Sequence, residues 1–245
     1  GQANWNQLEA DKRAVMLARS EGILNDYALP KMAADRRIKK ALEITEPMFP
    51  VIYGDNFIKI LAAELVRQSM ENRCIDKLVL VGNMIELIPL LEHLSRYPVP
   101  ISVQTTHPVR YEYTAHKLLY EKGLAISNSY ISPEAWKKGD LIVFFEAGYR
   151  RMAMASPRAF YIELSNESRG LAPGLENALT MAGMDGSLQT LAPILESCLY
   201  TKAGIPQPVA EKENLDFQQN CREEFEMLLE TGEDMGMWET FRVFR

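Results

Sequence analysis

Cysteine and histidine are both scarce in this chain, and their spacing excludes two kinds of structure. The sequence has three cysteines, far apart at Cys74, Cys198 and Cys221, and three histidines. Widely spaced cysteines in odd number do not form a disulfide framework, and no tight His/Cys cluster matches a zinc motif. We therefore expect no metal site and a reducing, cytoplasmic location. Cys74 and Cys198 have apolar neighbours and are expected in the core.

Long apolar runs are also missing. No stretch approaches the roughly 18 apolar residues that a membrane-spanning helix needs, and the most apolar segment, 78–81, is only as long as a strand. The N-terminus lacks the charged start, apolar stretch and cleavage site of an export signal. The sequence thus predicts a soluble protein with no membrane partner.

Charge is unevenly distributed along the chain. The sequence has 27 Lys and Arg residues against 33 Asp and Glu residues, a net charge of −6. Residues 1–40 contain eight basic and five acidic side chains, whereas residues 211–245 contain ten acidic and four basic ones. Two solvated helical faces explain this, or else attraction between the two ends, within a chain or between subunits. The four bases within 36–40 are too few to indicate nucleic-acid binding by an acidic protein.

The first 73 residues are expected to form only helices. Helical spacing of apolar residues predicts helices over 5–21, 30–44 and 55–73. Two prolines within 46–50 must break the second helix from the third. Asp55 is expected to cap the third helix.

From residue 77 the pattern changes to short apolar segments separated by helices. Strands are predicted over 77–82, 100–104, 124–127, 140–145 and 159–164. Helices are predicted over 84–96 and 108–122, with a short one from 132 to 138. This alternation predicts the α/β class, a Rossmann-like three-layer sandwich with a mostly parallel sheet of five strands or slightly more.

Helices are expected again after Pro173. They are predicted over 174–182, 187–200 and 214–229, and the apolar stretch 235–244 is expected to dock against another surface. An apolar chain end also suits a homodimer interface. Three parts follow: a helical N-terminal segment (1–73), a Rossmann-like domain (74–203) and an acidic helical C-terminal extension (204–245).

Small and hydrogen-bonding side chains follow each predicted strand, and ligands of open parallel sheets bind at that edge. The candidates are Gly82, Asn83, Thr105, Thr106, His107, Arg110, Ser127, Asn128, Ser129, Glu146 and Arg150. A polar ligand lying across the sheet would need such groups. Ser, Thr and Asn also cap helices at these places, so binding and capping both remain open.

The candidate cofactor-binding residues lie at the first two strand ends and, further along, at Ser127, Asn128, Ser129 and Arg150. Gly82 and Asn83 form a turn into a helix whose N-terminus could hold a phosphate, although two of the three glycines of the dinucleotide fingerprint are missing. Thr105, Thr106 and Arg110 follow the second strand without an acid for a ribose hydroxyl, which suits the 2′-phosphate of NADP better than NAD. The alternative is that Arg110 is a surface residue on the first turn of a helix.

Glu146 and His107 are the candidate acid/base residues. Glu146 directly follows the fourth strand, so it would emerge at the ligand edge, where a carboxylate can act as a base or bind a hydroxyl. Arg150 could pair with Glu146 or with an anionic ligand. The structural alternatives are an ion pair between Glu146 and Arg150, and a helix cap by His107.

The layout of residues 77–165 resembles the Rossmann-like superfamily as a whole. The helix 55–73, which leads directly into the first strand, is also similar to sugar-phosphate isomerase domains, which bind phosphosugars with Ser/Thr clusters at strand ends. Their counterparts in this chain would be Ser127, Asn128, Ser129, Thr105 and Thr106.

Three functions follow as hypotheses. The first is binding of a small polar or phosphorylated metabolite or nucleotide at the carboxyl edge of the sheet, as in an NADP-dependent enzyme. The second, implied by the isomerase resemblance, is a phosphosugar-binding domain. The third is a non-catalytic scaffold with a degenerate cofactor loop, whose helical ends mediate assembly, because fold does not imply function.

Overall fold

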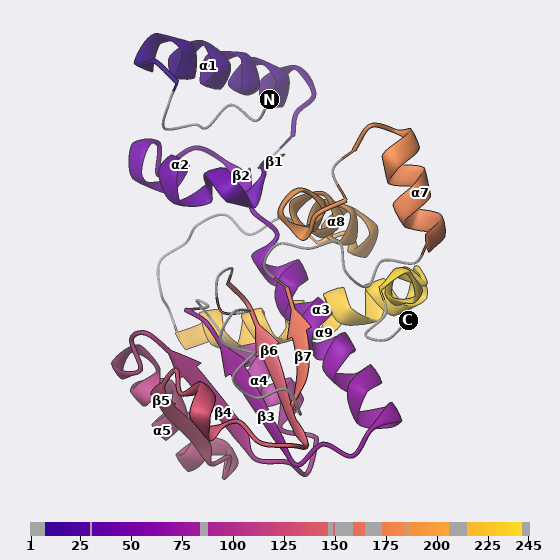
Figure 1. Cartoon of the computed structure of the whole chain (residues 1–245). Coiled ribbons are helices and arrows are strands. Elements are labelled where there is room, and N and C mark those ends of the chain that lie inside the picture. Colours follow the sequence, from indigo (N-terminus) through magenta and orange to yellow (C-terminus); the bar gives the residue numbers. More distant parts are fainter. Residues whose placement is uncertain are drawn as a thin grey trace.

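The structure of the chain is a computed structural model, and it confirms the predicted Rossmann-like α/β class (Figure 1). It describes residues 8–29, 31–83, 88–146, 149, 159–164, 173–184, 186–205 and 215–241. Its main sheet has five parallel strands. They are β3 (Lys77–Val81), β4 (Ile101–Thr105), β5 (Ile126–Tyr130), β6 (Asp140–Phe144) and β7 (Phe160–Glu163).

The strands are arranged in the order β5-β4-β3-β6-β7. The chain starts in the centre at β3, moves outward through β4 and β5, and then returns to β6 on the other side of β3. This is the strand order of dinucleotide-binding folds, in which ligands bind where the direction reverses. Val81 of β3 lies opposite Phe144 of β6, so the carboxyl ends of these two strands form that point.

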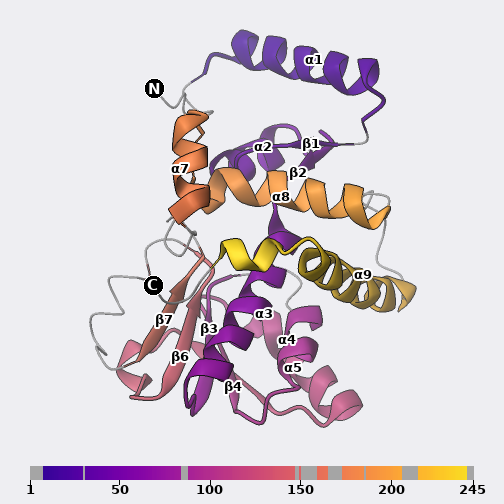
Figure 2. The same ribbon diagram turned by 90° about the vertical axis from the view of Figure 1, so that its right-hand side faces the viewer.

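Both faces of the sheet are covered, which explains why β3 is apolar from Leu78 to Val81. On one face, Leu78 and Leu80 pack in the main core with three helices: α3 (Asp55–Asn72), α4 (Ile88–Leu94) and α5 (Val109–Lys122) (Figure 2). On the other face, Val79 and Val81 pack in a second cluster with Trp136, which follows the short 3-10 helix η3 (Pro133–Ala135).

The prediction that the first 73 residues form only helices is wrong. The segment contains α1 (Ala10–Asp26), β1 (Met32–Ala33), the 3-10 helix η2 (Arg36–Ile38), α2 (Lys39–Thr45), β2 (Val51–Ile52) and α3. β1 and β2 pair in parallel, with Met32 opposite Val51. The expected helix over 30–44 starts late because the Asp35 side chain accepts a hydrogen bond from the backbone N–H of Arg37 (2.8 Å) and begins a new turn there.

The C-terminal helices pack against the rest of the chain. They are α7 (Pro173–Met181), α8 (Leu188–Ala203), α9 (Leu215–Asp234) and the 3-10 helix η4 (Met237–Thr240). In Figures 1 and 2, α8 lies between the N-terminal elements and the sheet. Trp238 and Phe241 pack on Phe57 of α3, and their ring centroids lie 6.1 and 5.8 Å, respectively, from the ring centroid of Phe57. The expected docking of the chain end is confirmed, but it takes place in the chain's own core and does not support the predicted homodimer.

Two further expectations are wrong. The third strand of the sheet runs from Ile126 to Tyr130 instead of 124–127, because the N–H of Leu124 bonds to Leu118 and still belongs to the end of α5 at Gly123. Cys74 and Cys198 are exposed rather than in the core. The side chain of Cys221 lies outside the described residues.

No helix in the described part of the chain is long and apolar enough to cross a membrane. Among the same residues, no three His, Cys, Asp or Glu side chains are grouped so that they could hold a metal ion.

Candidate functional site

The carboxyl ends of β3 and β6 meet closely because of Gly82. Its φ is +137°, a conformation that favours glycine, and a Cβ there would lie 3.3 Å from the Cβ of Phe145. This approach places Asn83 beside Glu146, and the backbone N–H of Asn83 donates to Glu146 Oε1 (2.7 Å). The strand reversal is therefore bridged by a backbone amide and a carboxylate.

The side chain of Asn83 is held by the end of β4. The hydroxyls of Thr105 and Thr106 both donate to Asn83 Oδ1, the second at 3.0 Å. His107 is exposed, and its Nδ1 lies 2.9 Å from the Thr106 hydroxyl. The structure thus brings these predicted residues together with Gly82 and Glu146, but it engages the two threonines in positioning Asn83.

The other predicted residues lie elsewhere or outside the described part. Arg110 is exposed on the first turn of α5, as in the surface interpretation. Ser127, Asn128 and Ser129 lie within the edge strand β5, where Asn128 Nδ2 donates to the carbonyl of Pro108 (2.5 Å). Arg150 lies outside the described residues, so its expected pairing stays a prediction.

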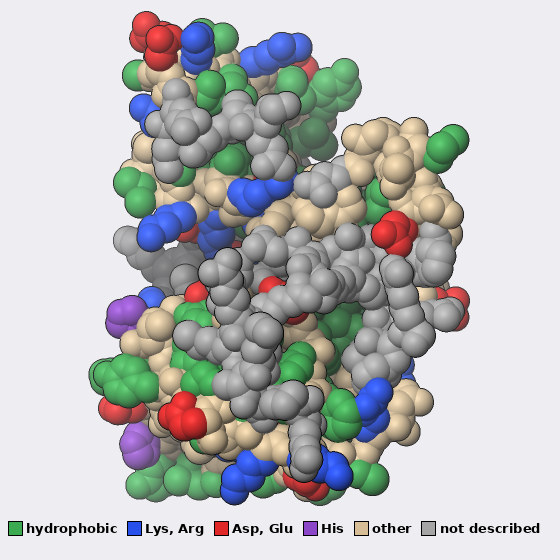
Figure 3. Space-filling view, viewed as in Figure 1, with side chains coloured by type: hydrophobic (Ala, Val, Ile, Leu, Met, Phe, Trp, Pro, Cys, Tyr) green, Lys and Arg blue, Asp and Glu red, His purple; other side chains and the backbone are tan. Residues whose placement is uncertain are grey.

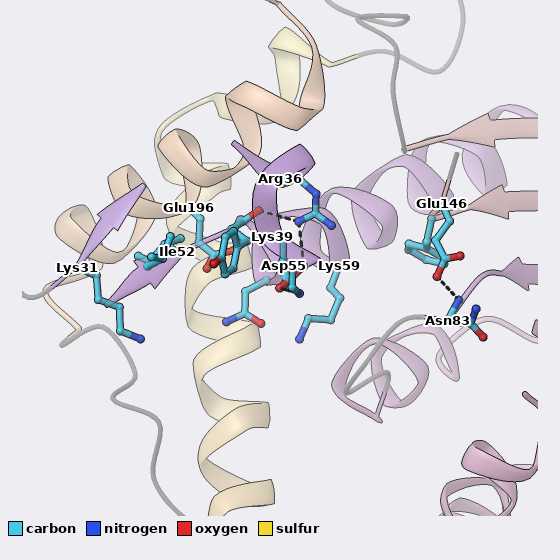
Figure 4. Close-up of a pocket in the computed structure, with 13 residues that line it drawn as sticks. Lys31, Arg36, Lys39, Ile52, Asp55, Lys59, Asn83, Glu146 and Glu196 are labelled. Carbon is cyan, nitrogen blue, oxygen red and sulfur yellow. Dashed lines mark hydrogen bonds and ion pairs between the residues drawn. The ribbon is translucent and has the colours of Figure 1, made fainter. Parts of the chain in front are cut away.

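A cavity of about 380 Å³ opens at the strand reversal (Figure 4). Asn83, Phe145 and Glu146 form one side, and the opposite side comes from the N-terminal elements, the start of α3 and α8. The latter residues are Lys31, Arg36, Lys39, Val51, Ile52, Tyr53, Asp55, Asn56, Lys59 and Glu196. The charged residues among them were not predicted as part of a site.

Two cations of the cavity share one carboxylate. Arg36 Nη1 donates to Asp55 Oδ1 (2.9 Å) and to the carbonyl of Tyr53 (2.7 Å), and Lys39 Nζ donates to Asp55 Oδ2 (2.5 Å). Burial alone would raise the pKa of Asp55, but the charges of Arg36 and Lys39 outweigh it and lower that pKa. Asp55 therefore stays ionised between the two cations, and Glu43 Oε1 lies 3.7 Å from Lys39 Nζ as a further counter-charge.

Two lysines, Lys31 and Lys59, add further positive charge to the lining of the cavity. Lys59, on α3, is only 4% exposed. Burial lowers the pKa of Lys31, although the charges of Glu196 and Glu224 partly oppose the shift. Because Glu224 belongs to α9, the basic N-terminal part and the acidic C-terminal part do approach each other within one chain at Lys31. Figure 3 shows Lys and Arg side chains on the N-terminal elements, above an indentation in the surface.

Glu196 belongs to α8, and its carboxylate lies against the N-terminus of α3. The residue is only 6% exposed. Its Oε2 accepts the backbone N–H of Phe57 (2.8 Å), and the N–H of Asn56 also bonds to it. Burial raises the pKa of Glu196 to about 7, and the charge of Asp55 acts in the same direction. The two N–H donors and the charge of Lys59 oppose the shift without cancelling it.

A polar network next to Glu196 joins three helices. Asn56 Nδ2 donates to Tyr200 Oη (2.8 Å) and to Glu224 Oε1 (3.2 Å), and the Tyr200 hydroxyl donates to Glu224. Burial, followed by the charge of Glu224, raises the pKa of Tyr200. The network therefore holds α3, α8 and α9 together beneath the cavity with Tyr200 in its neutral form.

Glu196→Gln should reduce the pH dependence of stability. The carboxyl ionises near pH 4.5 in the unfolded chain and near pH 7 in the folded protein. Between these values the folded protein binds more protons, so Glu196 makes the free energy of unfolding fall as pH rises, by up to about 3 kcal/mol. Urea unfolding across this range should show a flatter profile for Glu196→Gln than for wild type. Glu230→Gln, on the exposed face of α9, is the matched control, and equal profiles for all three proteins would contradict the prediction.

Comparison with known proteins does not assign this chain to a family. A scan against protein-family models found no match, and a search of curated proteins found none either. Fold and geometry define a Rossmann-like α/β protein with a charged cavity at its strand reversal. That cavity is the candidate functional site.

Proposed function

We propose that the chain binds a small anionic metabolite, carrying a phosphate or carboxylate group, in the cavity at the strand reversal. The observation that supports this most is the charge of the lining. Four of the described residues that line the cavity are basic (Lys31, Arg36, Lys39 and Lys59), and three are acidic (Asp55, Glu146 and Glu196). Basic side chains gathered in one partly buried cavity attract an anionic ligand, because charges interact more strongly there than in bulk water.

The size and position of the cavity narrow the ligand class. Its volume of about 380 Å³ is near the lower end of the range for ligand pockets. This favours a phosphorylated metabolite or a mononucleotide over a dinucleotide. In addition, the N–H of Asn83 faces Glu146, at the turn where a dinucleotide fold would place a pyrophosphate. We infer that the anionic group lies at the lysines, with hydroxyl or amino donors of the ligand directed towards Glu146.

NADP and phosphosugars remain ligands to be tested. Arg110 does not belong to the described lining of the cavity, and neither do Ser127 and Ser129. The cavity therefore adds no support to a 2′-phosphate at Arg110 or to a phosphosugar at β5. If the protein is an enzyme, Glu146 is the proposed acid/base residue, because it lies at the end of β6 inside the cavity.

Lys39→Ala should weaken binding of the anion, whereas Lys40→Ala should not. Lys39 lines the cavity and its neighbour Lys40 is exposed outside the described lining. A thermal-shift screen with inorganic phosphate, ribose 5-phosphate, AMP and NADP identifies the stabilising compound. Removing one charged hydrogen-bond donor should then weaken its affinity by about tenfold or more.

The screen also separates the alternative functions. Equal losses in Lys39→Ala and Lys40→Ala would contradict the proposed site. A response to NADP alone that disappears in Arg110→Ala would favour the dinucleotide hypothesis. No response from any of the four compounds would favour the scaffold hypothesis.

A further inference from the structure

We infer that a small oxyanion entering the cavity is taken up together with one proton, which Glu196 accepts. This deepens the proposed function and rests on it. The pH of the solution thus regulates the site, and the ligand is a multiply charged oxyanion of the sulfate or phosphate type.

The position of Glu196 provides the geometric basis. A helix N-terminus favours an anion, and at α3 the protein's own carboxylate occupies that place by accepting the N–H of Phe57 (2.8 Å). Glu196 lines the same cavity as Lys31 and Lys59. An oxyanion held by these lysines therefore lies close to a second negative charge, that of Glu196, which is only 6% exposed. Such a like-charge pair disfavours the ionised carboxylate.

The proton balance is simple. The ionised carboxylate of Glu196 takes one proton from the solvent and becomes a carboxylic acid, and no other bond changes. The acid keeps a carbonyl oxygen for the N–H of Phe57 and gains an O–H that can donate to the oxyanion. Because burial already raises the pKa of Glu196 to about 7, this protonation costs little at neutral pH.

The groups around Glu196 include one competitor for this role. Asp55 and Lys59 face it from α3, Tyr200 from its own helix and Lys31 from the N-terminal segment. The pKa of Asp55 is lowered and that of Tyr200 is raised, so both keep their charge states near neutral pH. Burial lowers the pKa of Lys31, and loss of its charge would also weaken anion binding at high pH.

Calorimetric titration with sodium sulfate tests the inference, because sulfate does not itself titrate near neutral pH. Binding linked to one proton should weaken by up to about tenfold per pH unit above pH 7. We expect this slope in wild type and in Glu230→Gln, and a flat profile in Glu196→Gln between about pH 6 and 9. Heats measured in two buffers with different ionisation enthalpies count the protons taken up by wild type.

Three other outcomes would contradict the role of Glu196, the coupling to a proton, or the proposed function itself. The same slope in wild type and Glu196→Gln would overturn the role of Glu196, assign the titration to Lys31 and leave the proposed function standing. Sulfate binding by wild type without proton uptake would overturn the coupling alone. Absence of sulfate binding at every pH would overturn the proposed function and the coupling with it. If Glu196→Gln does not fold, the two-buffer measurement on Lys31→Arg decides, because the arginine keeps the charge without titrating in this range: proton uptake that persists supports Glu196, and its loss assigns the proton to Lys31.

Discussion

Replacing Gly54 with alanine is expected to destabilise the protein by about 3 to 5 kcal/mol and to abolish anion binding. Gly54 precedes α3 with a φ of +79°, and a Cβ there would lie 2.5 Å from the nitrogen of Pro193 and even closer to the carbonyl carbon of Ala192. Both are backbone atoms of α8, so neither can move aside as a flexible side chain would. Backbone strain and overpacking each cost about 1 to 3 kcal/mol and act together here.

The matched control for this variant is Gly123→Ala. Gly123 has a similar φ of +66°, but nothing lies within 4 Å of the position that an alanine methyl group would take, so only the backbone strain remains. Urea unfolding should therefore show a loss of about 1 kcal/mol for Gly123→Ala and a much larger one for Gly54→Ala. Equal losses would mean that α3 and α8 can separate freely. In that case the N-terminus of α3 would not be fixed on Glu196 as described.

The sheet could be predicted from the sequence because its signals are local. The apolar run 78–81 is buried on both faces of a parallel sheet, and Gly123 ends α5 in a left-handed conformation. β1 and β2 gave no such signal, since each has two residues and is defined by pairing across about twenty positions. Their pairing depends on the turn at Asp35 and the break over 46–50, and neither of these features shows in the sequence which segment β1 pairs with.

Only the half of the candidate site that the sheet forms could be predicted from the sequence. Asn83 and Glu146 follow strands, and the rule that ligands bind at strand ends identified them. Lys31, Arg36 and Lys39 belong to the basic stretch that fits a solvated surface equally well, and only the fold places them at the strand reversal. One sequence signal could have identified a residue of the cavity: Lys59 is a charged residue within an otherwise apolar run, between Ile58 and Ile60.

Trp238→Ala is expected to destabilise the protein by about 3 to 5 kcal/mol, as is typical of removing a buried tryptophan. Trp238 is only 5% exposed. Its ring stacks on Phe57, and its Nε1 donates to the carbonyl of Leu229 (3.4 Å). Gly232 leaves room for the ring, because a Cβ there would overlap with it. Trp238→Phe keeps an aromatic ring on Phe57 and should lose less stability, as measured by urea unfolding.

The same variant distinguishes an internal role of the chain end from a role in assembly. Because the N–H of Phe57 is a donor to Glu196 and lowers its pKa, loosening Phe57 by Trp238→Ala should raise that pKa and move the decline of sulfate binding to higher pH. Trp238→Phe should keep the pH profile of wild type. If the chain end instead joined two copies, Trp238→Ala would shift sedimentation from dimer to monomer, with little loss of stability in the monomer. The packing of Trp238 in the core of its own chain favours the first result.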